Sequence, residues 1–329
     1  MTVFPGRLIV CLSLVVSILS CVSTVRSQTG PLTRLRVGTT NVSPSNWPLF
    51  VGQKQGFFTA EGLNLEIIVL RGSTLQTQAL LTDGVQINAY TVDTAARAVL
   101  AGAPLKLVAS NQERPTFRVV VHKDIKAWSD LKGKHLAAGS PGGTYYSVLL
   151  AMLDANGIGK NDVNIIAIGN SSARVHAMNV GTVQGAIVAQ PEDLVLIDSG
   201  FKVLGSVKEY LKNIQYQGYV VNGEWAGTHE ETLVGFLRAV RRSFTWLHDP
   251  KNKKSSIDIL ATQVHVKRDW LETIYDLMIN QQYLSTDGMP DRKGIENMLT
   301  LTTKYGVGRV TIPPMERWVD LSYMKKAAR

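Results

Sequence analysis

The sequence predicts an α/β fold in which mostly parallel sheets are covered by helices on both faces. Short apolar runs typical of strands alternate with longer segments of helical period. Glycines and small polar residues follow the strands, where loops at the carboxyl edge of a sheet are expected. Several such units of strand, loop and helix precede Val121, and a second series of them follows it. With 329 residues, 45% of them hydrophobic, the chain is long enough for two compact lobes.

The first 27 residues have the order of a secretory signal peptide. Arg7 precedes an apolar run from Leu8 to about Val22, and small and polar residues follow up to Ser27. The run is about 15 residues long and is interrupted by serines, whereas a membrane-spanning helix needs about 20. We therefore expect cleavage before Gln28 and a periplasmic or other extracytoplasmic location.

Both cysteines, Cys11 and Cys21, lie in this segment, so a mature chain would have no disulfide and no thiol nucleophile. Residues 18–21 form a loose lipobox with a large residue, Leu19, at its second position. Lipid attachment at Cys21 is therefore an alternative that ranks below simple cleavage. Without Arg7 and Arg26 the formal net charge falls from +9 to +7. The basic residues are scattered in small clusters, which favours solvated surfaces over a nucleic-acid-binding face.

Five strands are predicted before Val121, over residues 35–38, 65–70, 85–90, 105–109 and 117–121. A helix is predicted over 49–58. Two further helices begin at neighbouring strand ends, one after Gly72-Ser73-Thr74 and one at Thr91-Val92-Asp93-Thr94. Their N-termini carry free N–H groups beside small hydroxyl side chains, which predicts a cradle for a ligand at the carboxyl edge of the sheet.

The same order of elements begins again after Val121. Strands are predicted over 135–138, 164–168, 185–188, 202–204 and 217–221, with helices after the loops at 139–144 and 170–172. The last strand could carry the chain back to the first lobe. The remainder is predicted to be helical, with apolar faces over 233–247 and 270–278. We assign everything after Val221 to packing rather than to a site.

The order of short motifs along the chain is more specific than any one of them. The motifs are GQKQGFFTAEG (52–62), GST (72–74), LLTDGVQINA (80–89), AGAP (101–104), DLKGK (130–134) and SPGGT (140–144). Their order, from about Leu35 to Arg242, resembles that of the substrate-binding proteins of ABC importers in the nitrate, sulfonate, taurine and thiamine-precursor group.

This resemblance implies a two-lobed fold of the type II periplasmic-binding-protein kind, with the ligand held in a cleft between the lobes. We place the first lobe at 28–120 and 221–329 and the second lobe at 121–220. The resemblance further implies a monomer that closes around a small molecule and delivers it to an ABC permease in the inner membrane.

The loops at strand ends supply the candidate ligand-binding residues of such a cleft. On the first lobe these are Thr40, Asn41, Asn46, Trp47, Ser73, Thr74, Thr91 and Asp93. On the second lobe they are Gly142, Gly143, Thr144, Tyr145, Ser171, Ser172, Gln190 and Glu192. Any single serine or threonine of this set could instead serve only as a helix N-cap. The glycines of 140–144 favour close approach of a ligand to the backbone.

Two ligand classes fit these residues. Helix N-termini favour an anionic group, so a sulfonate-like or other small organic anion is our first choice. Arg71, beside Gly72, could reach an acid group. Asp93 and Glu192 would instead suit an amine-bearing ring such as a thiamine-precursor pyrimidine. Trp47, Tyr145 or Tyr146 could stack on such a ring.

The sequence contains few signs of an enzyme. Its six histidines have no metal-ligand spacing, and there is no phosphate-binding glycine loop and no nucleophile elbow. We therefore expect a binding protein without catalytic residues, metal or cofactor. An enzyme or a sensor subunit on the same fold is the alternative from another functional class.

Overall fold

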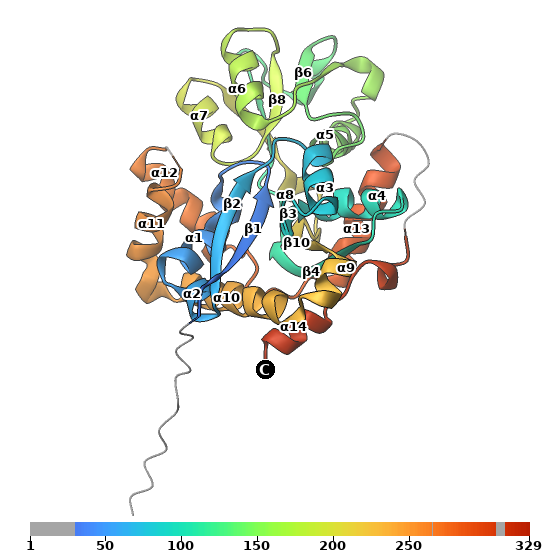
Figure 1. Cartoon of the computed structure of the whole chain (residues 1–329). Coiled ribbons are helices and arrows are strands. Elements are labelled where there is room, and N and C mark those ends of the chain that lie inside the picture. The colour runs from blue at the N-terminus through green and yellow to red at the C-terminus, as the bar shows by residue number, and fades with distance from the viewer. Residues whose placement is uncertain (1–29, 265, 307–312) are drawn as a thin grey trace, which may run out of the picture.

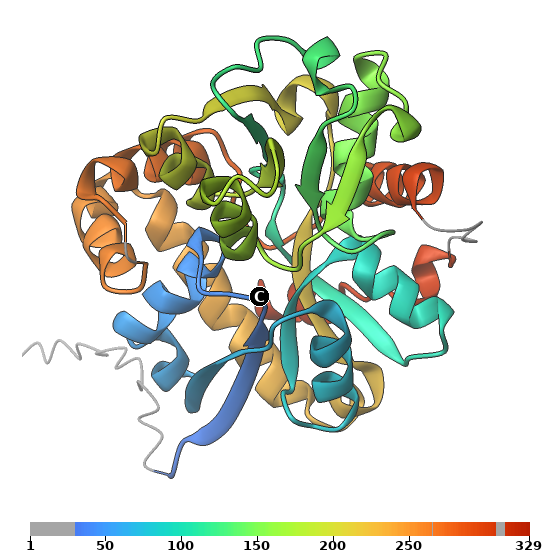
Figure 2. The same cartoon turned by 90° about the horizontal axis from the view of Figure 1, so that it is seen from above.

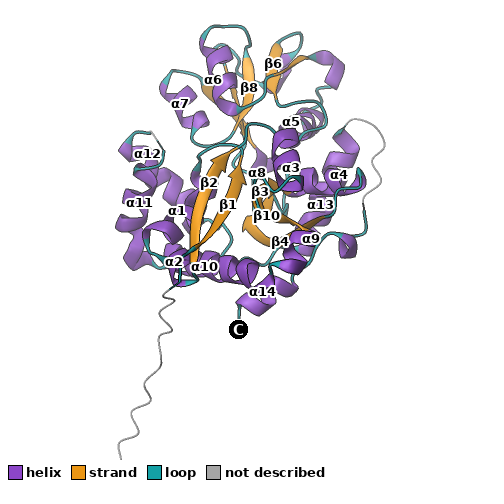
Figure 3. Ribbon diagram, viewed as in Figure 1, coloured by secondary structure: helices purple, strands orange, loops and turns teal. Residues whose placement is uncertain are grey.

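The computed structural model describes residues 30–264, 266–306 and 313–329. The predicted signal peptide and both cysteines lie outside these residues. The described chain forms two five-stranded sheets with helices around each of them (Figures 1 and 3). Within the described ranges, no helix is long and apolar enough to cross a membrane.

The first sheet has the strand order β2-β1-β3-β10-β4. Four strands run parallel, and β10 is antiparallel to both of its neighbours. The strands are β1 (Thr33–Thr39), β2 (Leu63–Val69), β3 (Ile87–Thr91), β4 (Leu105–Gln112) and β10 (Gln217–Asn222). The strand predicted over 217–221 thus returns the chain to the first sheet.

The second sheet has the order β7-β6-β8-β5-β9 and repeats this plan with one antiparallel strand, β5, in the fourth place. Its strands are β5 (Arg118–Val121), β6 (His135–Ala138), β7 (Asn164–Ala167), β8 (Gly185–Val188) and β9 (Lys202–Ser206). Both sheets are therefore mixed and mostly parallel, as the sequence predicts.

Fourteen α-helices lie in the described residues. The first seven are α1 (Trp47–Lys54), α2 (Phe57–Ala60), α3 (Ser73–Leu81), α4 (Val92–Leu100), α5 (Thr144–Ala155), α6 (Ser171–Asn179) and α7 (Glu192–Asp198). The others are α8 (Val207–Tyr210), α9 (Gly223–Thr228), α10 (Glu230–His248), α11 (Lys253–Ala261), α12 (Arg268–Tyr275), α13 (Arg292–Tyr305) and α14 (Ser322–Ala327). A π-helical turn, Asp276–Asn280, follows α12.

One predicted helix is wrong in its extent. The segment 49–58 contains two helices, α1 and α2, because Gly56 takes a left-handed φ of +70° between them. A residue with a side chain adopts this conformation only with strain, and the glycine therefore allows the chain to turn here. The pattern of apolar residues alone does not show such a break.

Apolar residues of the helices and sheets form the cores. The long helix α10 packs Leu233, Phe236, Leu237 and Val240 against strands of the first sheet, as its predicted apolar face requires. In the second sheet, a smaller cluster joins Val120 and Val188 to α6 and α7. Seen from above, α13 lies on the opposite side of the molecule from α11 and α12 (Figure 2).

Two segments, 113–117 and 207–216, connect the two sheets. The predicted lobe boundaries at 120/121 and 220/221 fall inside β5 and β10, three and four residues after the connections end. The division of the whole chain into lobes with those boundaries stays a prediction. The arrangement of the sheets directs the loops at their strand ends toward a common space.

Candidate functional site

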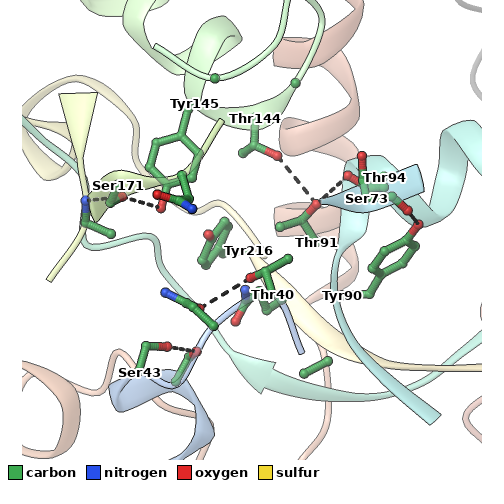
Figure 4. A pocket seen from close by; sticks show the side chains of 18 of the residues that line it. Thr40, Ser43, Ser73, Tyr90, Thr91, Thr94, Thr144, Tyr145, Ser171 and Tyr216 are labelled. Carbon is green, nitrogen blue, oxygen red and sulfur yellow. Dashed lines mark hydrogen bonds between the residues drawn. The ribbon is translucent and has the colours of Figure 1, made fainter. Parts of the chain in front are cut away.

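A cleft of about 320 Å³ lies among the loops that follow the strands of both sheets. It has a size within the usual range for small-molecule sites. From the first sheet it is lined by residues after β1, β2 and β3, and from the second sheet by residues after β6, β7 and β8. The connecting segments add Thr116 and Tyr216. Figure 4 shows hydroxyl groups from both sheets directed at this space.

Four helices begin at the cleft. The N-terminal residues of α3, α4, α5 and α6, or the residues directly before them, all belong to its lining. The first N–H groups of a helix have no partner within the helix, and the helix dipole adds a partial positive charge there. At α6, the Asn170 side chain caps Ala173 N. Convergence of several such ends on one space makes an environment that favours an anionic group.

The charged residues of the lining are two arginines, Arg71 and Arg97. Arg71 is exposed and has no hydrogen-bond or ion-pair partner among the described residues. It precedes Gly72, whose φ of +104° turns the chain from β2 into α3. Within the described chain, no aspartate or glutamate lines the cleft. The lining therefore carries a positive formal charge.

Asp93 lies behind the cleft wall rather than in it. Its side chain is fully buried, and Arg97 Nη1 lies 2.7 Å from Asp93 Oδ2. Thr144 Oγ1, at the start of α5 in the second sheet's half, donates to Asp93 Oδ1 at 2.7 Å. Oδ1 thus accepts a hydrogen bond, whereas Oδ2 faces the guanidinium in an ion pair and has no hydrogen bond among the described residues. The carboxylate serves a contact between α4 and α5 and neutralises Arg97.

A second arginine stands behind the other wall. Arg174 on α6 is buried, donates to the carbonyl oxygens of Ile168 and Gly169, and donates to Ser171 Oγ at 2.9 Å. Its guanidinium lies 4.3 Å from the ring centroid of Tyr145. Burial lowers the pKa of Arg174 from its ordinary value. This guanidinium fixes the face of the Tyr145 ring and the Ser171 hydroxyl, and both groups line the cleft.

Glu192, at the start of α7, accepts a hydrogen bond from Ser172 Oγ at 3.0 Å and does not belong to the cleft lining. Burial raises the pKa of Glu192 above its usual range, which means that the folded protein disfavours its charged form. Asp193 beside it is paired with Arg118 at 3.0 Å. Neither acid lines the cleft, and Glu192 Oε2 and Asp193 Oδ2 are buried without a hydrogen bond among the described residues.

Nine of the sixteen predicted site residues line the cleft. These are Thr40, Asn41, Ser73, Thr91, Gly143, Thr144, Tyr145, Ser171 and Gln190. They come from six different loops of the two sheets, so the structure brings together residues that the sequence separates by up to 150 positions. Their contact with a ligand stays a prediction.

The other seven lie elsewhere, each for a physical reason. Trp47 is fully buried, and its Nε1 donates to the Ser256 carbonyl at 3.0 Å. Asn46 is also buried and donates to Thr39 Oγ1 at 3.0 Å. Thr74 is exposed on α3 outside the lining, and Gly142 lines a separate depression near Thr302. Asp93, Ser172 and Glu192 make the protein contacts described above.

Several lining residues were missed by the sequence analysis. They are mainly hydroxyl and amide side chains: Ser43, Ser45, Gln76, Gln112, Thr116, Asn170 and Gln217. Thr94 and Ser140 also line the cleft and lie in the loops 91–94 and 140–144, which the sequence already indicates. Ser43 and Asn170 lie in loops already identified, so position at a strand end could have found them. One residue after Val221 reaches the cleft: Met278, in the π-helical turn, lines it and is also part of a buried apolar cluster.

A family model described as NMT1/THI5 like matches residues 43–253, which is more than half of the chain. The chain belongs to this family. The match covers the motifs on which the sequence resemblance depends and confirms it.

The chain is also similar to individual proteins over most of its length. "Putative binding protein YtlA" of Bacillus subtilis is 23% identical over 282 residues, covering 84% of each chain. The ligand-binding component of an ABC-type import system from Staphylococcus aureus, solved with zinc bound, superposes with a TM-score of 0.76 at 16% identity, covering 90% of this chain and 99% of that one. The alkanesulfonate-binding protein SsuA from Xanthomonas axonopodis pv. citri, bound to MOPS, gives 0.72 at 16% identity, covering 88% and 100%. These neighbours confirm the two-lobed fold class.

Proposed function

We propose that this chain is the solute-binding component of an ABC importer, and that it captures a small organic anion in the cleft. The observation that carries the proposal is the lining itself, where four helix N-termini and the free guanidinium of Arg71 meet without a lining carboxylate in the described chain. Each helix end contributes about 0.3–1 kcal/mol toward an anion, and more when it is partly buried.

Capture by lobe closure follows from the position of the cleft. A ligand that contacts loops of both sheets at once stabilises the closed arrangement over an open one. The Thr144–Asp93 hydrogen bond joins the same two halves beside the cleft and would be made or broken with that motion. The family membership and the import-system and sulfonate-binding neighbours support this role.

An amine-bearing ring such as a thiamine-precursor pyrimidine is the second candidate ligand. It is favoured by the aromatic ring of Tyr216 in the lining, which could stack on a flat ligand. The Tyr145 ring is not free to do so, because Phe117 stacks on it and the Arg174 guanidinium covers it. Neither of the two acids that first suggested it lines the cleft. Asp93 is held by Thr144 and Arg97, and one oxygen of Glu192 accepts from Ser172. An organic anion therefore remains the first choice.

A thermal-shift screen of the chain from Gln28 onward tests the proposal. The panel contains sulfonates, nitrate and carboxylates on one side and aminopyrimidines and polyamines on the other. A ligand at ~100 times its dissociation constant adds about 2.7 kcal/mol to the unfolding free energy and raises Tm by several degrees. We expect stabilisation by organic anions. Stabilisation only by amines would contradict the anion proposal and favour the second candidate.

An enzyme or sensor role on the same fold is separated from import by a different observation. A gene for a membrane permease and one for an ATPase beside the gene of this chain are expected for an importer. Turnover of a bound ligand into a product, measured by mass spectrometry after incubation, would contradict a pure binding role.

A further inference from the structure

The side-chain amide of Gln190 has no partner of its own. Gln190 follows β8 in the lining of the cleft, and its residue surface is only 4% exposed. Both amide atoms, Nε2 and Oε1, are buried and make no hydrogen bond to any described residue. Buried amide groups in native proteins are almost always paired, since an unpaired one keeps its full desolvation cost.

The backbone of Gln190 shows why the side chain is held in place. Its N–H donates to Thr116 Oγ1 at 3.3 Å, which continues the antiparallel register of β8 against β5 beyond Arg118 and Val188. The neighbouring Ala189 N–H approaches Ser171 Oγ at 3.5 Å. The main chain is therefore anchored to protein groups on both sides, while the amide group is left for something inside the cleft.

A second unpartnered amide oxygen lines the same cleft. Gln217 Oε1, at the start of β10, is buried without a hydrogen bond among the described residues. By contrast, the amides of Gln76 and Gln112, also in the lining, donate to the Ala89 and Arg114 carbonyl oxygens. The unpaired state is thus specific to Gln190 and Gln217 and is not shared by every glutamine of the lining.

These atoms constrain the chemistry of a partner. Oε1 of either glutamine accepts and needs a donor, whereas Nε2 of Gln190 donates and needs an acceptor. A plain sulfonate, carboxylate or nitrate offers only acceptors, and an ammonium group offers only donors. A carboxamide, lactam or urea group offers both side by side and can pair with a glutamine amide through two hydrogen bonds.

We infer that the ligand of this cleft is an organic anion that also carries a neutral carboxamide-type group, and that Gln190 is the residue that selects for this group. The inference rests on the proposed anion-binding function and adds a specificity-determining contact to it. The anionic group is held by the helix N-termini and Arg71, and the amide-bearing end by Gln190 and Gln217.

Matched probes test this selection. Succinamate and levulinate have the same carboxylate and length, but levulinate has a methyl ketone in place of the carboxamide. Sulfoacetamide and 2-oxopropanesulfonate form the equivalent sulfonate pair. Titration calorimetry with the chain from Gln28 onward should give at least about tenfold tighter binding for the amide member of a pair. Both members offer a carbonyl oxygen to Gln190 Nε2, but only the amide offers an N–H to Gln190 Oε1, which the ketone leaves buried and unpaired.

Two variants assign this preference to its residue. Gln190→Met keeps the length of the side chain and removes both polar atoms, so it should cancel the preference. The amide and ketone members of a pair should then bind this variant within about twofold of each other. Its Tm without ligand should be equal or higher, because an unpaired buried amide is removed. Gln78→Met, on the exposed face of α3 outside the cleft, is the matched control and should retain the preference.

The outcomes separate the inference from the proposed function. Equal affinity of the two members in the wild type, as expected if only water pairs with Gln190, would overturn the inference and leave anion binding intact. Binding of neutral propanamide as tightly as succinamate would overturn the anion function and leave the Gln190 contact. A preference that survives in Gln190→Met, or a Tm lowered by several degrees, would show a merely structural glutamine. Binding of no member of either pair would contradict both.

Discussion

The ion pair between Asp93 and Arg97 behind the cleft gives a quantitative test of the site's electrostatics. The Asp93 side chain is 0% exposed and that of Arg97 is 32% exposed. Arg97→Met leaves a buried carboxylate with only the Thr144 hydroxyl as a close donor, which costs about 3–5 kcal/mol of unfolding free energy. Asp93→Asn leaves an arginine that can turn toward water, and Thr144 can still donate to the amide oxygen. We expect a loss of only about 1–2 kcal/mol there.

Urea unfolding at neutral pH measures this asymmetry. The double variant should be more stable than the sum of the single losses predicts, with a coupling energy of about 2–3 kcal/mol. Equal losses for the two single variants, or additive losses in the double variant, would refute the reasoning. The same Asp93→Asn protein should bind an organic anion within about threefold of wild type, because Asp93 does not line the cleft. Loss of binding would instead make Asp93 a ligand contact.

Three further changes have defined outcomes. Thr144→Arg fills the cleft at the start of α5 and should abolish ligand binding in calorimetry; undiminished affinity would remove that loop from the site. Arg71→Met should weaken anion binding about 3–10-fold and reduce its dependence on salt, and an unchanged salt dependence would exclude Arg71 from the site. Burial raises the pKa of Asp193 to about 6 although Arg118 lies beside it, so the fold favours the protonated carboxyl group. The stability gained from this protonation is complete below about pH 4 and is lost as the pH rises through 6. The difference in unfolding free energy between wild type and Asp193→Asn should therefore change by about 2–3 kcal/mol between pH 4 and pH 7.5, with the wild type losing stability, and a constant difference would contradict this.

Local chemistry explains why part of the site could be predicted. Turns into helices have residue signatures, so Gly72 before α3 and Thr91 before α4 mark the helix N-termini that line the cleft. The carboxyl ends of parallel strands meet at one edge, which brings the loops after β1, β2 and β3 together without further information.

The remaining residues depend on tertiary packing. Trp47 follows the first strand-end loop, but six of the eight residues of α1 are buried and none of them lines the cleft. The sequence does not show whether this tryptophan faces the cleft or the core. Asp93 occupies the first turn of α4, where a cap, a ligand contact or an ion pair are equally compatible with the sequence. Met278 reaches the cleft because the turn after α12 packs in one buried cluster with apolar residues of α1, far away in the sequence. The positions of these residues can be found only once the tertiary structure is known.

A crystal structure with the tightest-binding organic anion of the panel tests the central claim most directly. The account predicts that the anionic oxygens lie about 3 Å from backbone N–H groups at the starts of α3, α5 or α6, with Arg71 facing them. An anion seated outside this cleft, or a cationic group of the ligand against Asp93, would contradict it.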